Sequence, residues 1–342
     1  MKNFNVGMSD WRHQLRSNER KTKVVIAAFI LIFIFVGLLF DTFIGMQLYR
    51  MSAQQVFDAL LHLRVTPYAT LVMIGIAGIS LLVTFTLYDR IMLMGTDSFE
   101  VTPDTARAMD EKQLYNVVEE MKVAAGLNYM PKVYIIEANY MNAFASGFSE
   151  KSAMVAISRG LMTKLDRQEL QAVMAHELSH IRHHDIKLTL TVSVLSNILL
   201  LAIDYLFYSM LFSNNSRSSR NKGGNTLLII VMVLRFVLPI ITTVLTLFLS
   251  RTREFMADSG AVELMRDNKP LARALIKINS DHFDNAEENA QEYRQTSHES
   301  VRRASYIFDA AKFSGGGGLS DFFSTHPTLE RRLKALGLKL KE

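Results

Sequence analysis

Four long apolar stretches stand out along the chain: Val24–Phe40, Tyr68–Tyr88, Leu188–Phe212 and Thr226–Leu249. The first two, of 17 and 21 residues, contain no charged residue. Because a helix rises about 1.5 Å per residue, about 20 apolar residues cross the roughly 30 Å of hydrocarbon in a bilayer. We therefore predict transmembrane helices over residues 24–44 and 68–88, joined by an external loop over residues 45–67.

The third and fourth stretches each contain a charge. Asp204 and Arg235 are costly at bilayer depth unless they face protein or each other. The loop between these stretches is rich in Ser, Asn and Gly, which is typical of a flexible turn. We interpret residues 188–249 as a hydrophobic helical hairpin, and the pattern leaves open whether it spans the membrane or only associates with it.

The distribution of lysine and arginine predicts the orientation of these helices. Only Arg50 and Arg64 lie between the first two apolar stretches, whereas six basic residues precede them: Lys2, Arg12, Arg16, Arg20, Lys21 and Lys23. Because basic residues flank the cytoplasmic ends of membrane helices, we place the N-terminal segment 1–23 and residues 89–187 in the cytoplasm. This basic flank favours an uncleaved anchor over a signal peptide.

The polar remainder, residues 89–187 and 250–342, makes one domain-sized unit that the hairpin interrupts. Its hydrophobic periodicity predicts a mainly α fold with a small β-sheet. The last predicted helix of its first half begins with a capping box, because Asp166 is followed three residues later by Glu169. The predicted helices are Thr105–Gly126 and Asp166–His184, and the predicted strands are Lys132–Glu137 and Met154–Ser158.

Composition narrows the class of protein. The chain has 342 residues, of which 49% are hydrophobic, so disorder is excluded. The chain contains no Cys, which excludes disulfides, thiolate metal sites and a Cys nucleophile. A net charge of +5 is too weak to indicate nucleic acid as a partner and is more typical of a protein on an anionic membrane face.

One motif in the predicted helix Asp166–His184 carries chemistry. His176 and His180 are four residues apart, so both imidazoles lie one turn apart on the same face and can reach one ion. Glu177 lies beside them, where a carboxylate can take a proton from a zinc-activated water. We interpret the motif as a site for one Zn²⁺ per chain.

The third ligand is less directly indicated. His184 continues the histidine stripe, but it would lie about 12 Å along the axis from His176, too far to share a zinc with bonds near 2 Å. The metzincin class requires Gly and His where this chain has His183 and Ile186.

Two acidic residues follow the fourth apolar stretch. Glu254 is the first glutamate after Glu177 and so is a candidate for the third ligand. The alternative interpretation is a solvated charge at the end of a helix. Asp258 lies one turn further on, where it could accept a hydrogen bond from the outer nitrogen of a ligand histidine.

The sequence also resembles a known family nearly from end to end. It is similar to the HtpX branch of membrane-bound zinc metalloproteases, relatives of the CaaX prenyl proteases. Besides the apolar helices, the resemblance rests on four motifs in matching order: NAFASG at 142–147, VMAHELSHIRHHDI at 173–186, SRTREFMADSGAVEL at 250–264 and THPTLERR at 325–332.

The resemblance implies a gluzincin-type zinc domain, with a glutamate as third ligand, on integral membrane helices. It implies His176, His180 and Glu254 as zinc ligands and Glu177 as general base. It also implies that His326 lies near the developing oxyanion.

Two further roles follow from the same likeness. Residues 142–147, with Asn142, Ala143 and Phe144 at their start, would seat the substrate backbone, and Arg332 would anchor the region around His326. One departure is Thr328, where the family often has a second Pro. It bears on the role of His326 and not on the zinc site.

The implied function is a zinc metalloendopeptidase in the bacterial inner membrane, with its active site facing the cytoplasm. Its partners would be the lipid bilayer and damaged or unfolded membrane-protein substrates, as in a stress response. One alternative is a CaaX-type processing protease that acts on lipidated C-termini. Another is a membrane transporter or metal-handling protein, which only Asp204 and Arg235 favour.

Overall fold

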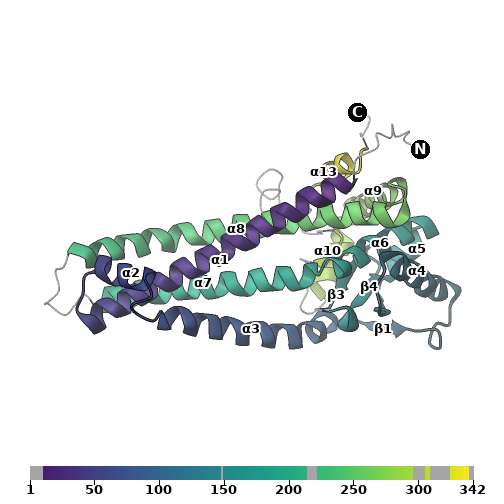
Figure 1. Ribbon diagram of the computed structural model, residues 1–342. Helices are drawn as coiled ribbons and strands as arrows, with labels where there is room; N and C mark the ends of the chain where they lie inside the picture. Colours follow the sequence, from purple (N-terminus) through teal and green to yellow (C-terminus); the bar gives the residue numbers. More distant parts are fainter. Residues whose placement is uncertain (1–10, 148, 214–221, 296–304, 309–323, 339–342) are drawn as a thin grey trace. The chain divides into compact units, whose positions relative to one another are not determined.

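A computed structural model describes residues 11–147, 149–213, 222–295, 305–308 and 324–338. The chain divides into two compact units. The membrane unit comprises residues 23–84 and 189–248, and the sheet unit comprises residues 1–22, 85–188 and 249–342. Each of the long helices α1, α3, α7 and α8 contributes residues to both units (Figure 1).

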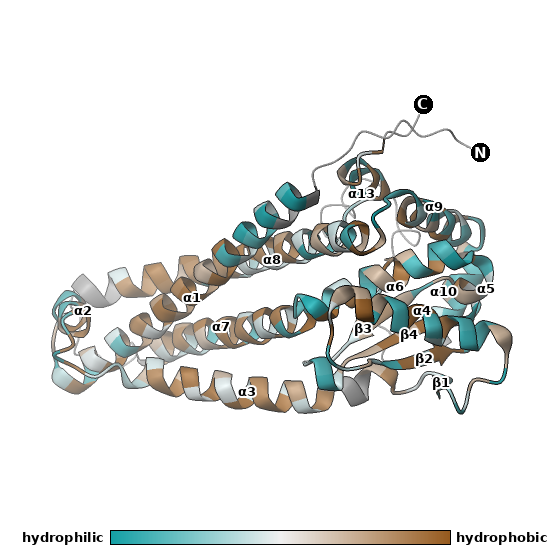
Figure 2. Ribbon diagram, turned by 45° about the vertical axis from the view of Figure 1, so that its right-hand side comes forward, coloured by the Kyte–Doolittle hydropathy of each residue, from teal (hydrophilic) through white to brown (hydrophobic). Residues whose placement is uncertain are grey.

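The membrane unit is helical in its described residues apart from the short connections at residues 50–52 and 62–67. Its helices are α1 (Trp11–Tyr49), α2 (Ala53–Leu61), α3 (Tyr68–Leu93), α7 (Asp185–Ser213) and α8 (Lys222–Met265). Four of them, α1, α3, α7 and α8, are long and apolar enough to cross a membrane. Figure 2 shows the hydrophobic stretches along these four helices. Many of their large apolar side chains are exposed, as expected for helices that face lipid.

Two polar contacts between helices hold the membrane unit, one buried and one partly exposed. The carboxylate of Asp41 in α1 accepts hydrogen bonds from the first turn of α3, from the N–H of Ala69 at 2.7 Å and the hydroxyl of Thr70 at 2.7 Å. Arg235 in α8 donates to Asp204 in α7 at 2.7 Å. The two charges inside the apolar stretches therefore face each other, which lowers the cost of placing them in lipid.

The sheet unit is built on a four-stranded mixed sheet in the order β1-β2-β4-β3. The strands are β1 (Ser98–Val101), β2 (Lys132–Ile136), β3 (Ala143–Ser146) and β4 (Met154–Ser158). Strands β2 and β4 are parallel, and the outer pairs are antiparallel. The predicted strands match β2 and β4. Strands β1 and β3 are four residues long and were not predicted from periodicity, because so short a stretch gives little alternation.

Helices cover this sheet and complete the unit. They are α4 (Met109–Ala125), α5 (Arg159–Lys164), α6 (Arg167–Arg182), α9 (Lys269–Asp284), α10 (Ala286–Gln295) and α13 (Leu329–Ala335), with a short 3-10 turn at Glu150–Ser152. Helix α6 packs against α4, α9 and the edge strand β3. The edge of the sheet therefore lies next to the helix that carries the histidine motif.

Side chains from alternate sheet positions enter two separate cores. Ile135, Ala145 and Val155 join a large core with α4, α6 and α9, whereas Phe144 and Tyr306 belong to a smaller cluster on the other face. This alternation follows from the period of two in a strand. It directs the side chain of Phe144 away from α6 while its backbone stays in the edge strand.

The predicted helix Thr105–Gly126 begins four residues later than expected, as α4. The carboxylate of Glu111 accepts hydrogen bonds from the N–H groups of Arg107 and Ala108 and so caps the helix there. Met109, at the first helical position, is 83% exposed.

Candidate metal centre

Helix α6 presents the two histidines to one point. Its capping box is confirmed, since Asp166 accepts from the N–H of Glu169 at 2.9 Å and Glu169 accepts from the N–H of Asp166 at 3.0 Å. Within the helix His176 is fully buried, and its Nε2 lies 3.2 Å from Nε2 of His180. Two nitrogens that share a tetrahedral zinc at bonds of about 2.0–2.1 Å stand roughly 3.4 Å apart.

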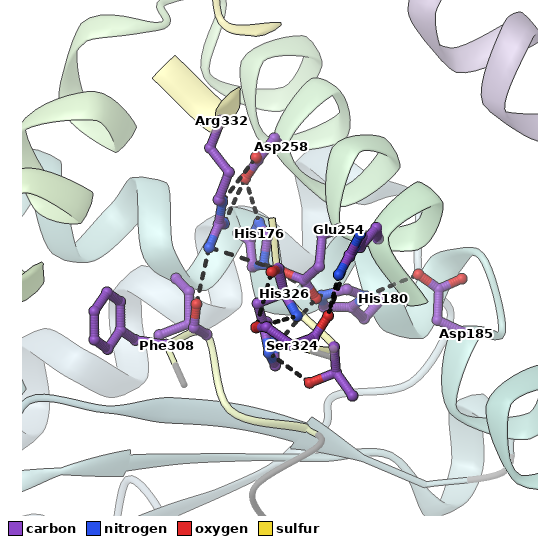
Figure 3. A network of polar contacts seen from close by, with 12 residues as sticks. His176, His180, Asp185, Glu254, Asp258, Phe308, Ser324, His326 and Arg332 are labelled. Atoms are coloured by element: carbon purple, nitrogen blue, oxygen red, sulfur yellow. Dashed lines mark hydrogen bonds and ion pairs between the residues drawn. The ribbon is translucent and has the colours of Figure 1, made fainter. Parts of the chain in front are cut away.

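Glu254 of α8 completes the cluster. Its carboxylate oxygens lie 3.7 Å from Nε2 of His176 and 3.5 Å from Nε2 of His180 (Figure 3). One ligand atom from each of these three residues lies within 4.8 Å of the other two. Glu254 is also buried, and its Oε2 has no hydrogen bond from the described residues. The sequence interpretation of Glu254 as a solvated helix-end charge is therefore wrong.

The donor set and spacing fit a zinc ion. Two imidazole nitrogens and one carboxylate oxygen are the ligands of a catalytic zinc site, in which a fourth position stays available. A buried carboxylate oxygen with no hydrogen-bond partner costs free energy unless a cation binds it. His176, His180 and Glu254 are thus the residues that would hold the ion.

Carboxylates also lie behind both histidines. Asp258, one turn after Glu254 in α8, has Oδ1 3.1 Å from Nδ1 of His176, as the sequence suggested. Asp185, the first residue of α7, has Oδ2 2.8 Å from Nδ1 of His180. Each carboxylate fixes the ring and leaves Nε2 facing the centre.

Sequence reasoning did not find the role of Asp185. Its carboxylate also pairs with Arg253, the residue before Glu254. The guanidinium of Arg253 donates to the backbone oxygen of His183 at 2.8 Å. This buried pair joins the end of α6 to α8, and so it links the segments that carry all three ligands. A carboxylate five residues after His180 was the signal available in the sequence.

Arg332 reaches the same cluster from α13. It donates to both oxygens of Asp258 at 2.9 and 2.6 Å and to the backbone oxygen of Ile307 at 2.8 Å. Its Nη1 also lies 3.6 Å from Oε2 of Glu254. Arg332 is only 3% exposed, and its charge offsets those of the two neighbouring carboxylates.

His326 lies at the edge of the cluster. Its Nε2 is 3.8 Å from Oε1 of Glu254, and its Nδ1 is 3.0 Å from the hydroxyl of Thr325. The side chain is therefore close enough to the centre to contact a substrate held there. Its assignment to the oxyanion stays a prediction.

Glu177 is buried beside the cluster without being part of it. Neither of its carboxylate oxygens has a hydrogen bond that meets normal geometry within the described residues. The backbone N–H of Ala145 in β3 lies close enough to interact with the Glu177 carboxylate. Burial, followed by the nearby charge of Glu254, raises the pKa of Glu177 well above its ordinary value. A group with a raised pKa is suited to accept and return a proton near neutral pH.

Residues 142–144 have partners within the chain. The Asn142 side chain donates to the backbone oxygen of Phe308 at 3.1 Å and to the hydroxyl of Tyr293 at 2.9 Å. The backbone oxygen of Ala143 accepts from the N–H of Ile307 at 2.9 Å. The segment around Ile307 therefore pairs with the first part of the β3 edge. The substrate-binding roles of Asn142, Ala143 and Phe144 stay predictions.

Burial sets the protonation of the ligands. Burial lowers the pKa of His176, and that of His180 falls well below its ordinary value for the same reason. Both rings are thus neutral at pH 7, as zinc ligands must be. Glu254 lies beyond Leu249, the end of the apolar stretch, and burial raises its pKa to about 8.

These values predict that acid weakens zinc binding through Glu254. Below pH 8 the metal must displace a proton from this carboxylate, so apparent affinity should rise by up to about tenfold per unit between pH 6 and 8 and then level off. Competition with a chromophoric chelator measures this. The Glu254→Gln variant should bind zinc more weakly, and its zinc affinity should not rise between pH 6 and 8 in this way. A wild-type affinity that is constant over this range would contradict the assignment.

Removing the carboxylate behind His180 should weaken zinc binding. We expect Asp185→Asn to lower the affinity for zinc by about 10–100-fold, because the ring loses the charged acceptor that orients it. Glu263→Gln is the control, since it removes a carboxylate from the partly exposed pair with Arg182 and should leave zinc affinity unchanged. Equal affinities for the two variants would show that Asp185 does not support His180.

Comparison with known proteins identifies the family. The chain matches Peptidase family M48 over residues 108–338. It is 38% identical to a Protease HtpX homolog of Helicobacter pylori (strain J99 / ATCC 700824) over 335 residues, which cover 96% of this chain and 98% of that protein. A Protease HtpX homolog of Dictyoglomus thermophilum is 37% identical over 231 residues, which cover 67% of this chain and 70% of that protein.

The fold also resembles that of a solved structure. The crystal structure of S. mikatae Ste24p aligns with a TM-score of 0.50 at 20% identity, covering 87% of this chain and 66% of that longer chain. At this identity the likeness concerns the fold alone. The family match spans the three metal-site residues, Glu177 and α13. The chain therefore belongs to Peptidase family M48, among the HtpX-type membrane proteases.

Proposed function

We propose that this chain is a membrane-bound zinc endopeptidase that hydrolyses damaged or misfolded membrane proteins. The observation that carries the proposal is the buried cluster of His176, His180 and Glu254 with the unbonded carboxylate of Glu177 beside it. A transport or purely structural role does not require a general base next to a metal site. The family match supports peptide hydrolysis as the reaction.

The chain's own residues divide the work of hydrolysis. When bound, zinc supplies a Lewis acid that lowers the pKa of water from 15.7 to about 7. Glu177 takes a proton from the attacking water and returns it to the leaving amine. His326, near Glu254, is placed to donate a hydrogen bond to the developing oxyanion, and such donors contribute about 10²–10³-fold to rate.

The edge strand offers a place for the substrate backbone. In an antiparallel edge strand the N–H and C=O of alternate residues point outward. The backbone oxygen of Ala143 points away from β4, because it accepts from the N–H of Ile307. The N–H and C=O of Ala145, two residues later, therefore also point away from β4. The N–H of Ala145 lies near Glu177. A peptide that extends β3 at Ala145 would therefore lie beside the general base.

Location supports membrane-associated substrates. His180 is eight residues before the apolar stretch that begins at Leu188, and Glu254 is five residues after Leu249. The site therefore lies close in sequence to the ends of two membrane helices. Together with the charge asymmetry of the first helices, this favours an inner-membrane enzyme whose site faces the cytoplasm.

A digestion assay tests the proposal. The detergent-purified chain with one zinc should cleave casein and an unfolded membrane protein, and a chelator should abolish cleavage until zinc is restored. Absence of cleavage by the zinc-loaded protein would contradict it. The CaaX-type alternative predicts cleavage of prenylated C-terminal peptides only. The transport alternative loses its support because Asp204 and Arg235 bind each other.

A further inference from the structure

A basic cavity lies in the sheet unit, on elements that also support the metal centre. It has a volume of about 350 Å³ and opens to the surface. Its lining comes from the first turns of α1, from α8 and from α13, all within one compact unit. The lining residues are His13, Ser17, Asn18, Lys21, Phe255, Arg331, Lys334 and Ala335.

The chemistry of this lining is that of an anion site. Lys21, Arg331 and Lys334 carry three fixed positive charges, and no carboxylate is among the described residues that line the cavity. Three like charges around one cavity repel one another, so an anion that enters it is stabilised. Asn18, which is 5% exposed, accepts a hydrogen bond from Nζ of Lys21 at 3.1 Å and so holds that ammonium in place.

The position along α1 identifies the source of the anion. Lys21 is three residues before Val24, where the apolar stretch begins, which is about 4.5 Å along a helix. Phospholipid headgroups occupy roughly 5–7 Å outside the hydrocarbon. The Lys21 end of the cavity is therefore at headgroup level. Figure 2 shows the change from hydrophilic to hydrophobic residues along this part of α1.

We propose that this cavity binds the phosphate of an anionic phospholipid headgroup. Such a ligand would join the start of α1 to α13 through ionic contacts with Lys21, Arg331 and Lys334, and it would lie beside Phe255 of α8. Arg331 precedes Arg332, and Phe255 follows Glu254. A bound headgroup would thus brace the two helices that carry these residues of the metal centre.

Thermal unfolding of the zinc-loaded, detergent-purified chain tests the proposal without an activity readout. Phosphatidylglycerol added to the micelles should raise the unfolding midpoint, because a ligand of the native state stabilises it, whereas phosphatidylcholine should not. The variant Lys21→Gln/Arg331→Gln/Lys334→Gln should need about 100-fold more phosphatidylglycerol for a half-maximal rise, at about fivefold for each cation. Lys334→Gln alone should need about fivefold more, which keeps the test usable if the triple variant folds poorly.

The matched control is Lys112→Gln/Lys122→Gln/Lys132→Gln, which removes the same charge from α4 and β2. It should respond to phosphatidylglycerol as the wild type does. Equal responses of the two triple variants would overturn the site. Inorganic phosphate at matched ionic strength distinguishes the sources: protection by phosphate alone, lost in the Lys21 triple variant, would overturn the lipid as the source of the phosphate.

Discussion

Glu177→Gln is expected to retain zinc and lose peptidase activity by about 10²–10⁴-fold in kcat, which is the usual contribution of a general base. The amide has nearly the same shape as the carboxylate but cannot accept the proton. Because Glu177 contacts none of the three metal-site residues through a hydrogen bond in the described structure, zinc content should stay at one per chain. The measurement is kcat on casein together with metal analysis of the same sample.

A matched variant separates chemistry from folding. Glu169→Gln changes another buried glutamate of α6, which caps the helix and pairs with Lys277 at 2.6 Å. It should lower the unfolding midpoint, because the ion pair with Lys277 is lost. It should not lower kcat comparably, because a glutamine still completes the capping box and so keeps the start of α6 in place. Wild-type kcat in Glu177→Gln would show that another group acts as base.

Arg332→Met is expected to destabilise the fold by about 3–5 kcal/mol, because it leaves the buried carboxylate of Asp258 without its cation. The side chain that is lost also holds the backbone of Ile307. The free energy of unfolding, from urea denaturation of the detergent-purified chain, measures the effect. The control is Arg182→Met, which breaks a partly exposed ion pair with Glu263. It should lower the free energy of unfolding by only about 0–1 kcal/mol. A similar small loss in Arg332→Met would contradict the electrostatic role of Arg332.

The pH dependence of this stability follows from Asp258. Burial alone would raise its pKa, but the charge of Arg332, with hydrogen bonds from His176 and Arg332, outweighs burial and lowers the pKa to about 2. A pKa that is lower in the folded than in the unfolded state adds stability above the unfolded value of 3.8. This contribution is lost as the pH falls from about 4 towards 2, and Arg332→Met should lack it.

The metal motif is the part of the site that the sequence predicts best. Two histidines four residues apart on a capped helix need only local geometry to converge. Glu254 is 78 residues beyond His176, so its convergence depends on how the chain returns from the apolar hairpin. Periodicity does not encode that path, and only the family resemblance indicated it.

Contacts between distant short segments were harder to predict. Strand β3 has four residues, too few for a periodic signal, and its partner at Ile307 lies far along the chain. Asp185 was overlooked because one acid at the start of a helix more often serves as a cap than as a partner of a metal ligand. Its role became visible only when Arg253 and His180 were placed around it.

Zinc-edge X-ray diffraction from crystals of the zinc-loaded chain tests the central claim most directly. The account predicts one anomalous peak per chain, bonded to Nε2 of His176, Nε2 of His180 and a carboxylate oxygen of Glu254 at about 2.0–2.2 Å. A peak whose third protein ligand is any other side chain, with the Glu254 carboxylate turned away, would contradict it.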